Sequence, residues 1–474
     1  MPTTVEKNPL ISLYRSLDSS DGRRLGKWHD SPAHNQREDV RRLHAYLLGG
    51  KDRLYKTSAL TKTRIWQHLF PDEPFDDARL RQTFHWALRS TEAFVAYLHW
   101  AGDEFDQQLA LATALRHRNV PTAAGRSLKR AGQLHERTRV RNEAYYRRQY
   151  ELEIERDEYR TAYRPLDAPH FQAISDTLDL TYYIEKLKAS WNMLYHQRIY
   201  KTNFELRFLD EVVQQVRTLD LSQHPVLAIH YYGYLGLVDD DASGRTVSRL
   251  RNAVRDNGHL LSPSDLRYVI LMAINLCINN VNQGREPFVR EAFEWYRLAV
   301  AEDVLAADGI LTRATYLNVV TNAIKLGEFD WVVGFVNDFS PRLEEEIRAN
   351  TERFARARIA YEQGDYATSM PLLVQVDFKH PVYNLMAKTL QLKIYYELEE
   401  FDALDSQLGS MTTYLRRKQM SDLYRENFGN LVRFVRQLSR LPPGDATKRE
   451  DLRRRVTDAT PLSEKKWLLE RFSA

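Results

Sequence analysis

The same short pattern recurs three times between residues 323 and 402 of this 474-residue chain. Each copy is the end of an apolar helical stretch, then a small or acidic turn, then an aromatic residue that opens the next helical stretch. The aromatic residues are Phe329, Tyr366 and Phe401, which are 37 and 35 residues apart. A period in this range predicts stacked helical hairpins, because one hairpin alone leaves an apolar face that its neighbour must cover.

Two of these turns read Gly327-Glu328-Phe329 and Gly364-Asp365-Tyr366, and Pro381 follows Gly364 by 17 residues. In these features residues 310–415 resemble the tetratricopeptide repeat (TPR) family. The third copy departs from the family pattern, because Glu399 stands where the glycine is expected. The resemblance implies an α-solenoid of stacked antiparallel helix pairs, and a groove in which another protein binds.

A second resemblance concerns the start of the chain. Its features are Ser31-Pro32, Leu69-Phe70-Pro71 and a helix that contains Arg79-Leu80-Arg81. This order is similar to a segment of uncharacterised bacterial repeat proteins. It implies no function.

Apolar residues at helical spacing predict an all-α fold. One such stripe contains Leu180, Ile184, Leu187 and Trp191, which share one face of a helix. Glycine and proline number only 19 and 17, which is typical of helices joined by short connections. Four segments are expected: an N-terminal helical region (1–110), a basic helical connector (111–168), a TPR-like repeat array (169–440) and a C-terminal helical cap (441–474).

Positive charge is concentrated between residues 116 and 148, a segment that contains ten basic residues and only two acidic ones. This segment is a candidate polyanion-binding patch, since arginine binds phosphate groups bidentately. The alternative is a solvated helix whose charge is balanced by the five acidic residues between 151 and 158. The candidate patch consists of Arg126, Lys129, Arg130, Arg137, Arg139, Arg141, Arg147 and Arg148.

The sequence contains no motif that indicates catalysis, a metal site or a cofactor. The only cysteine, Cys277, lies in an apolar run where a buried thiol is expected, so a cysteine-based zinc site is excluded. The loop Asp239–Gly244 begins like a calcium-binding loop, but Leu250 stands where that loop requires a bidentate glutamate. We therefore expect a non-enzymatic protein without cofactors.

No apolar stretch is long enough to cross a membrane, and no signal peptide is recognisable, so we expect a cytoplasmic protein. The predicted function is that of a scaffold or adaptor that binds a protein or peptide partner in a TPR-like groove. Tyr231, Tyr232 and Tyr234 are candidates for lining that groove, because tyrosine is favoured at recognition surfaces. They fit the interior between helices equally well. The alternative function is nucleic-acid binding or regulation through residues 116–148.

Overall fold

The computed structural model describes residues 4–50, 52–200, 202–306, 308–442 and 445–472, and within them the chain is all-helical. The described residues form 23 α-helices and no strand, only two isolated β-bridges. The predicted all-α class is confirmed. None of the described helices is long and apolar enough to cross a membrane.

Contacts divide the chain into two compact units, which are described separately below. Unit 1 comprises residues 1–139 and 144–181, and unit 2 comprises residues 140–143 and 182–474. The helices of unit 1, with α9 shared between the units, are α1 (Pro9–Ser16), α2 (Ser19–Asp30), α3 (Glu38–Leu48), α4 (Lys62–Leu69), α5 (Asp77–Ala101), α6 (Glu104–His117), α7 (Pro121–Glu136), α8 (Glu143–Tyr163) and α9 (Phe171–Tyr200).

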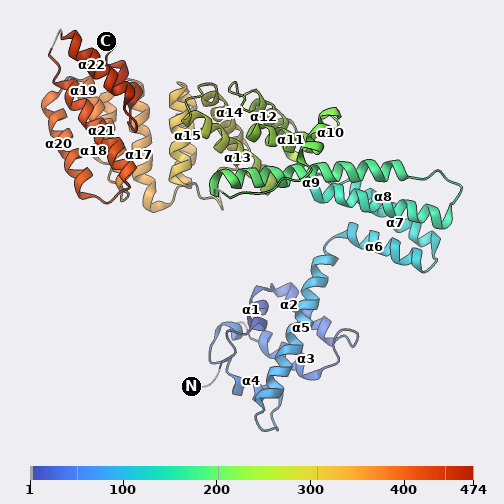
Figure 1. The fold of residues 1–474 in the computed structure, drawn as a ribbon. Coiled ribbons are helices and arrows are strands. Elements are labelled where there is room, and N and C mark those ends of the chain that lie inside the picture. The colour runs from blue at the N-terminus through green and yellow to red at the C-terminus, as the bar shows by residue number, and fades with distance from the viewer. Residues whose placement is uncertain (1–3, 51, 201, 307, 443–444, 473–474) are drawn as a thin grey trace. The chain divides into compact units, whose positions relative to one another are not determined.

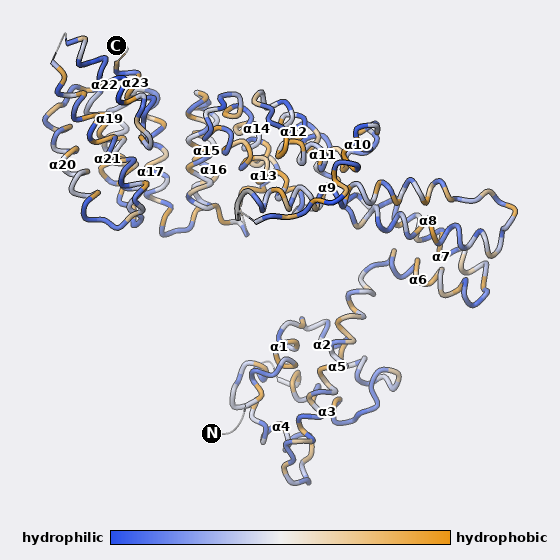
Figure 2. Tube along the Cα trace, viewed as in Figure 1, coloured by the Kyte–Doolittle hydropathy of each residue, from blue (hydrophilic) through white to orange (hydrophobic). Residues whose placement is uncertain are grey.

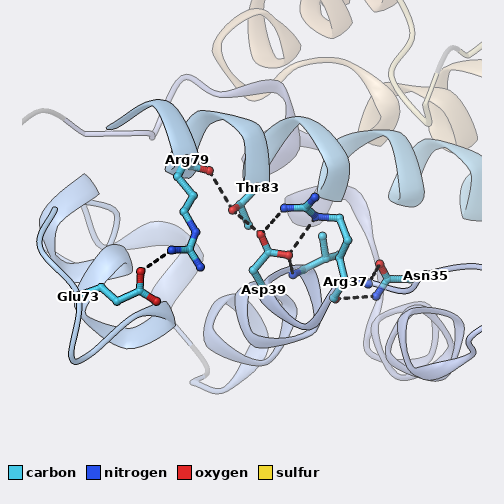
Figure 3. A network of polar contacts seen from close by, with 7 residues as sticks. Asn35, Arg37, Asp39, Glu73, Arg79 and Thr83 are labelled. Carbon is cyan, nitrogen blue, oxygen red and sulfur yellow. Dashed lines mark hydrogen bonds and ion pairs between the residues drawn. The ribbon is translucent and has the colours of Figure 1, made fainter. Parts of the chain in front are cut away.

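In unit 1, helices α1–α5 share one hydrophobic core, in which Leu10, Leu43 and Ile65 are fully buried. A polar network joins α3 to α5 beside this core (Figure 3). The carboxylate of Asp39 accepts hydrogen bonds from Arg37 (2.7 Å and 3.1 Å) and from Thr83 on α5 (2.8 Å). Burial opposes ionisation of Asp39, but these hydrogen bonds outweigh it and lower the pKa of the carboxyl group. The network therefore fixes α3 on α5.

Helices α6, α7 and α8 form the second part of unit 1, around a small core of Phe105, Ala112, Leu128, Ala131 and Leu152. Helices α6 and α7 pack together along their length. A tight turn joins the end of α6 to the start of α7. In it, Asn119 has a positive φ of 56° and the N–H of Val120 donates to the Leu115 carbonyl. Pro121 then opens α7, at the first helical position where its missing N–H is not needed.

Unit 2 consists of α10 (Leu209–Thr218) and a series of helical hairpins that follow one another along the chain (Figure 1). Apolar and polar residues are interspersed along these helices, as amphipathic helices require (Figure 2). The remaining helices are α11 (Pro225–Val238), α12 (Arg245–Asn257), α13 (Pro263–Asn282), α14 (Pro287–Ala301), α15 (Arg313–Lys325), α16 (Phe329–Phe339), α17 (Glu345–Glu362), α18 (Tyr366–Val374), α19 (Pro381–Glu397), α20 (Phe401–Arg417), α21 (Asp422–Ser439), α22 (Ala446–Asp458) and α23 (Lys465–Glu470).

The contacts between these helices repeat in a regular way. Within each hairpin the two helices pack on each other: α13 on α14, α15 on α16, α17 on α18, and α19 on α20. From α15 onward the first helices of successive hairpins also touch, so that α15 contacts α17, α17 contacts α19, and α19 contacts α21. The last of these layers shares a core with α22 and α23, in which Leu431, Val435 and Leu468 are fully buried.

The three turns that the sequence pattern singled out have the same backbone structure. Gly327, Gly364 and Glu399 each have a positive φ, of 71°, 77° and 57°. In each turn the N–H of the next residue donates to a carbonyl five residues back, as in Glu328 to Ala323 (3.1 Å). This is the hydrogen-bond pattern of a Schellman cap, which ends a helix with a residue in the left-handed conformation. The pattern therefore marks real helix ends, including the one where glutamate replaces glycine.

Candidate functional site

A groove in unit 2 is lined by the first helices of four consecutive hairpins, α15, α17, α19 and α21. It encloses about 640 Å³, and its lining also includes Ser463 and Glu464, which precede α23. This volume is in the range of sites that bind small molecules or short peptide segments. Its lining mixes apolar and polar side chains; the apolar and aromatic ones include Leu317, Phe354, Tyr383, Met386, Leu390 and Phe428.

Arg358 on α17 is the most unusual side chain of this groove. Its guanidinium donates a hydrogen bond to Thr321 Oγ1 on α15 (2.5 Å) and lies over the ring of Phe354, 5.9 Å from the centroid. No described carboxylate lies within salt-bridge distance of it. Burial lowers the pKa of Arg358, while the more distant Glu464 and Glu362 oppose that effect. The groove thus contains a partly buried cation that forms no ion pair among the described residues.

Lys393 on α19 is the second cation of the groove, and its charge is balanced by an ion pair. Its side chain is 7% exposed and its Nζ donates to Glu464 at 2.9 Å. The ammonium also lies over the ring of Tyr361, 4.6 Å from the centroid. An ion pair held over an aromatic ring is stabilised both by its counter-ion and by the ring quadrupole. Lys393 therefore anchors the segment before α23 to the groove wall.

Two buried polar atoms of groove-lining residues have no hydrogen-bond partner among the described residues. They are Thr389 Oγ1 on α19 and Asn427 Oδ1 on α21. Buried polar groups are normally satisfied, so these two atoms are exceptions in the groove wall.

The predicted tyrosine cluster lies elsewhere, on α11. Tyr231 and Tyr234 are 7% and 8% exposed, and Tyr232 is half-buried. Next to them, Gly233 lets the ring of Trp191 on α9 approach so closely that a Cβ atom would lie 2.7 Å from it. Two of the three tyrosines are therefore part of the interior between helices, and none of them lines the groove described above.

The predicted basic patch is partly neutralised by acidic residues of α6. Arg130 pairs with Glu104 (2.8 Å), and Arg148 pairs with Asp103 (2.6 Å) and Asp106 (2.9 Å). Hydrogen bonds and ion pairs from Arg148 and the backbone outweigh burial and lower the pKa of Asp103. The exposed members of the patch include Arg126, Lys129, Arg137 and Arg139, for which no ion pair is found among the described residues; Arg141 and Arg147 are exposed as well.

Other sequence features have structural roles. Cys277 is fully buried, as expected, and burial raises the pKa of its thiol. In the Asp239–Gly244 loop, the carboxylate of Asp241 accepts hydrogen bonds from the backbone of Ser243 (3.0 Å) and Thr246 (3.0 Å), so it caps the start of α12. Among the described residues no cluster of histidine, cysteine and acidic side chains is suited to a metal ion.

Sequence reasoning did not find the groove residues. The polar ones on helices are spread over α15, α17, α19 and α21, from Asn318 to Asn427, and each helix contributes only a few of them. A signal was nevertheless present. Arg358 and Lys393 lie at the same distance before the left-handed residue of their turns, Gly364 and Glu399, so placing these turns in register puts the two on adjacent layers. Comparisons with known proteins add no assignment: no family model, curated protein or solved structure matches this chain.

Proposed function

We propose that the protein is a non-enzymatic interaction module, an α-solenoid whose helical groove binds a peptide segment of a partner protein. One observation supports this most: the partly buried guanidinium of Arg358, which forms no ion pair among the described residues, lies in a groove lined by successive first helices. The contacts of α15 with α17, α17 with α19, and α19 with α21 support a solenoid arrangement. Stacked helix pairs of this kind present extended grooves to partner segments.

The chemistry of the groove indicates the character of the segment. A carboxylate of the partner would pair with Arg358, and charge-assisted hydrogen bonds of this type are the strongest in proteins. Tyr383 and Met386 on α19 provide apolar contact area beside it. Residues 167–439 contain more acidic than basic residues, which would favour a basic partner. The groove itself, however, is lined by two basic residues, Arg358 and Lys393, and by two acidic ones, Glu362 and Glu464. We therefore assign it a segment with one acidic group flanked by apolar residues.

A selection experiment tests this proposal. Random 12-residue peptides displayed on phage are selected on the full-length protein, and the enriched peptides are then titrated by fluorescence anisotropy. We expect enrichment of peptides with Asp, Glu or a free C-terminal carboxylate next to apolar residues. Their affinity should fall about tenfold or more in Arg358→Gln, since a hydrogen bond to a charged group is worth roughly 1.5–3 kcal/mol.

Arg353→Gln is the matched control, because Arg353 is on the same helix but does not line the groove. It should leave the affinity unchanged. Circular dichroism melting shows whether each variant is folded, and Arg358→Lys, which keeps the charge, should retain part of the binding. Peptides that bind Arg358→Gln and the wild type equally would contradict the proposal.

Polyanion binding through α7 is the second candidate function. Its support is the exposed stripe of Arg126, Lys129 and Arg137, which has no ion pair among the described residues. The simultaneous variant Arg126→Glu, Lys129→Glu and Arg137→Glu should lose retention on heparin if this stripe binds nucleic acid. Unchanged retention would leave the stripe as a solvated helix face.

A further inference from the structure

A second cleft of unit 2 is lined by four arginines from α20 and α21. They are Arg416 on α20 and Arg425, Arg433 and Arg436 on α21. The cleft encloses about 410 Å³ and is separate from the groove on α15, α17, α19 and α21, with which it shares no lining residue. Its other lining residues include the buried side chains of Leu415 and Val432, which form an apolar floor.

The charges of these arginines are not balanced by nearby acids. No ion pair joins any of the four to a carboxylate within the described ranges, whereas Arg440, one turn further along, pairs with Asp405 at 3.1 Å. Among the described residues, Arg436 donates to Thr412 Oγ1 (3.3 Å). Arg433 lies over the ring of Phe434, 4.8 Å from the centroid. Four guanidiniums within one small cleft repel each other, and an anion that binds them relieves this repulsion.

Arg425 has a different role from the other three. Its guanidinium donates to the carbonyls of Leu415 and Lys418, at the end of α20. It therefore holds the end of α20 against α21 and fixes one wall of the cleft. Positive charge at the C-terminus of a helix is also favourable, because the last carbonyls carry a partial negative charge. Arg416, Arg433 and Arg436 remain to contact a ligand.

Gly429 is the smallest residue of the cleft lining. It lies on α21 between Arg425 and Arg433. A Cβ atom built on it would have no atom of a neighbouring element within 4 Å, so packing does not require glycine at this position. Glycine inside a helix destabilises it relative to alanine. The space beside Gly429 is therefore open to a ligand in the cleft.

We infer that this cleft binds a small organic phosphate, with phosphate groups on Arg416, Arg433 and Arg436 and an apolar or aromatic body on Leu415 and Val432. Guanidinium groups match phosphate oxygens in bidentate geometry, which makes arginine the preferred partner of such ligands. The cleft volume is in the range of pockets for small molecules, and the apolar floor distinguishes it from a site for a bare inorganic anion. This inference does not depend on peptide binding in the other groove.

Calorimetric titration of the full-length protein tests the inference with four probes at equal ionic strength: ATP, inorganic tripolyphosphate, inorganic phosphate and adenosine. We expect ATP to bind more tightly than tripolyphosphate, and phosphate and adenosine to bind weakly or not at all. The double variant Arg433→Gln and Arg436→Gln should reduce ATP affinity at least tenfold. Gly429→Leu, which changes no charge, should reduce ATP affinity more than tripolyphosphate affinity because it fills the space beside the floor.

Arg440→Gln is the control variant, since Arg440 directly follows α21 and lies outside the cleft, where it pairs with Asp405. Its ATP affinity should equal that of the wild type. Three outcomes would overturn the inference: no binding of ATP by the wild type, binding that is unchanged in both cleft variants, or a 12-nucleotide single strand that displaces ATP and depends on the same arginines. The last result would assign the cleft to a polymer instead.

Discussion

Two arginine-rich regions of this chain differ in what their guanidiniums contact. In α6–α8, Arg116, Arg130 and Arg148 form ion pairs of 2.6–2.9 Å with acidic residues of neighbouring helices. At α20–α21, the arginines of the cleft form no ion pair among the described residues. The first region has the higher charge density in the sequence, but several of its arginines are paired with acidic residues, whereas no cleft arginine forms an ion pair among the described residues. The density of charge along a sequence therefore says little about which charges are free to bind a ligand.

The largest expected effect that tests this contrast is at Arg116. Its guanidinium contacts Glu155 at 2.8 Å, and the two side chains are 15% and 8% exposed. Arg116→Met would leave Glu155 as an uncompensated buried charge, so we expect a loss of roughly 3 kcal/mol in the stability of α6–α8. Urea denaturation, together with amide exchange of these helices, measures it.

A double variant and a surface control complete this test. Arg116→Met with Glu155→Met should recover most of the lost stability, because the isolated charge is gone. Arg118→Met, at an exposed arginine, should change stability by less than about 0.5 kcal/mol. If the single and the double variants are equally unstable, the ion pair is not what stabilises this region.

The turns within the hairpins provide the next smaller effect and sharpen the contrast, because there the local sequence does indicate the backbone structure. Glu399 has a φ of 57°, a conformation that disfavours residues with a Cβ atom. We expect Glu399→Gly to raise the free energy of unfolding by about 0.5–1 kcal/mol. Gly364→Ala, at a φ of 77°, should lower it by about 1 kcal/mol. Thermal unfolding compares the two, and a destabilised Glu399→Gly would refute the assignment of this turn.

A pH effect of smaller size is expected at Asp103. Burial opposes its ionisation, but hydrogen bonds from the Asp106 backbone and Arg148 outweigh this and hold its pKa below 3.8. A carboxyl group with a lowered pKa stabilises the folded state above its unfolded pKa, and this contribution is lost as pH falls through the folded value. Asp103→Asn should thus be less stable than the wild type at about pH 6. The difference should shrink as the pH falls below about 4, and a difference that does not depend on pH would exclude this ion pair as its source.

The smallest effect is expected at the cleft of α20–α21. Arg416 and Arg433 are exposed and have no carboxylate partner among the described residues. Arg416→Gln and Arg433→Gln should each change stability by less than about 0.5 kcal/mol in urea denaturation. A slight stabilisation is the favoured sign, because mutual repulsion decreases. A loss as large as that of Arg116→Met would mean that these arginines stabilise the fold and are not held for a ligand.

The sequence predicted much of the fold because helical periodicity is a local property. The stripe of Ile184, Leu187 and Trp191 is buried on α9 as expected, and the three aromatic residues that mark the repeat open α16, α18 and α20. Glycine in two of the turns reflects a backbone conformation that the sequence alone indicates.

The candidate sites were harder to predict, because they depend on which side chains meet across the fold. The pairing of Arg148 with Asp103 and Asp106 joins residues more than 40 positions apart and removes one arginine from the predicted patch. The cleft had a local signal: Arg425, Gly429, Arg433 and Arg436 are spaced to share one face of α21. No local pattern shows that these arginines form no ion pair with the acidic residues of α20.

The central claim is that a partner segment binds along the first helices of the hairpins. Amide hydrogen exchange of the full-length protein, with and without the tightest peptide from the selection, tests it most directly. We expect protection on α15, α17, α19 and α21, centred on the residues around Arg358 and Lys393, which is lost in Arg358→Gln. Protection confined to the second helices α16, α18 and α20, or to α7, would contradict the account.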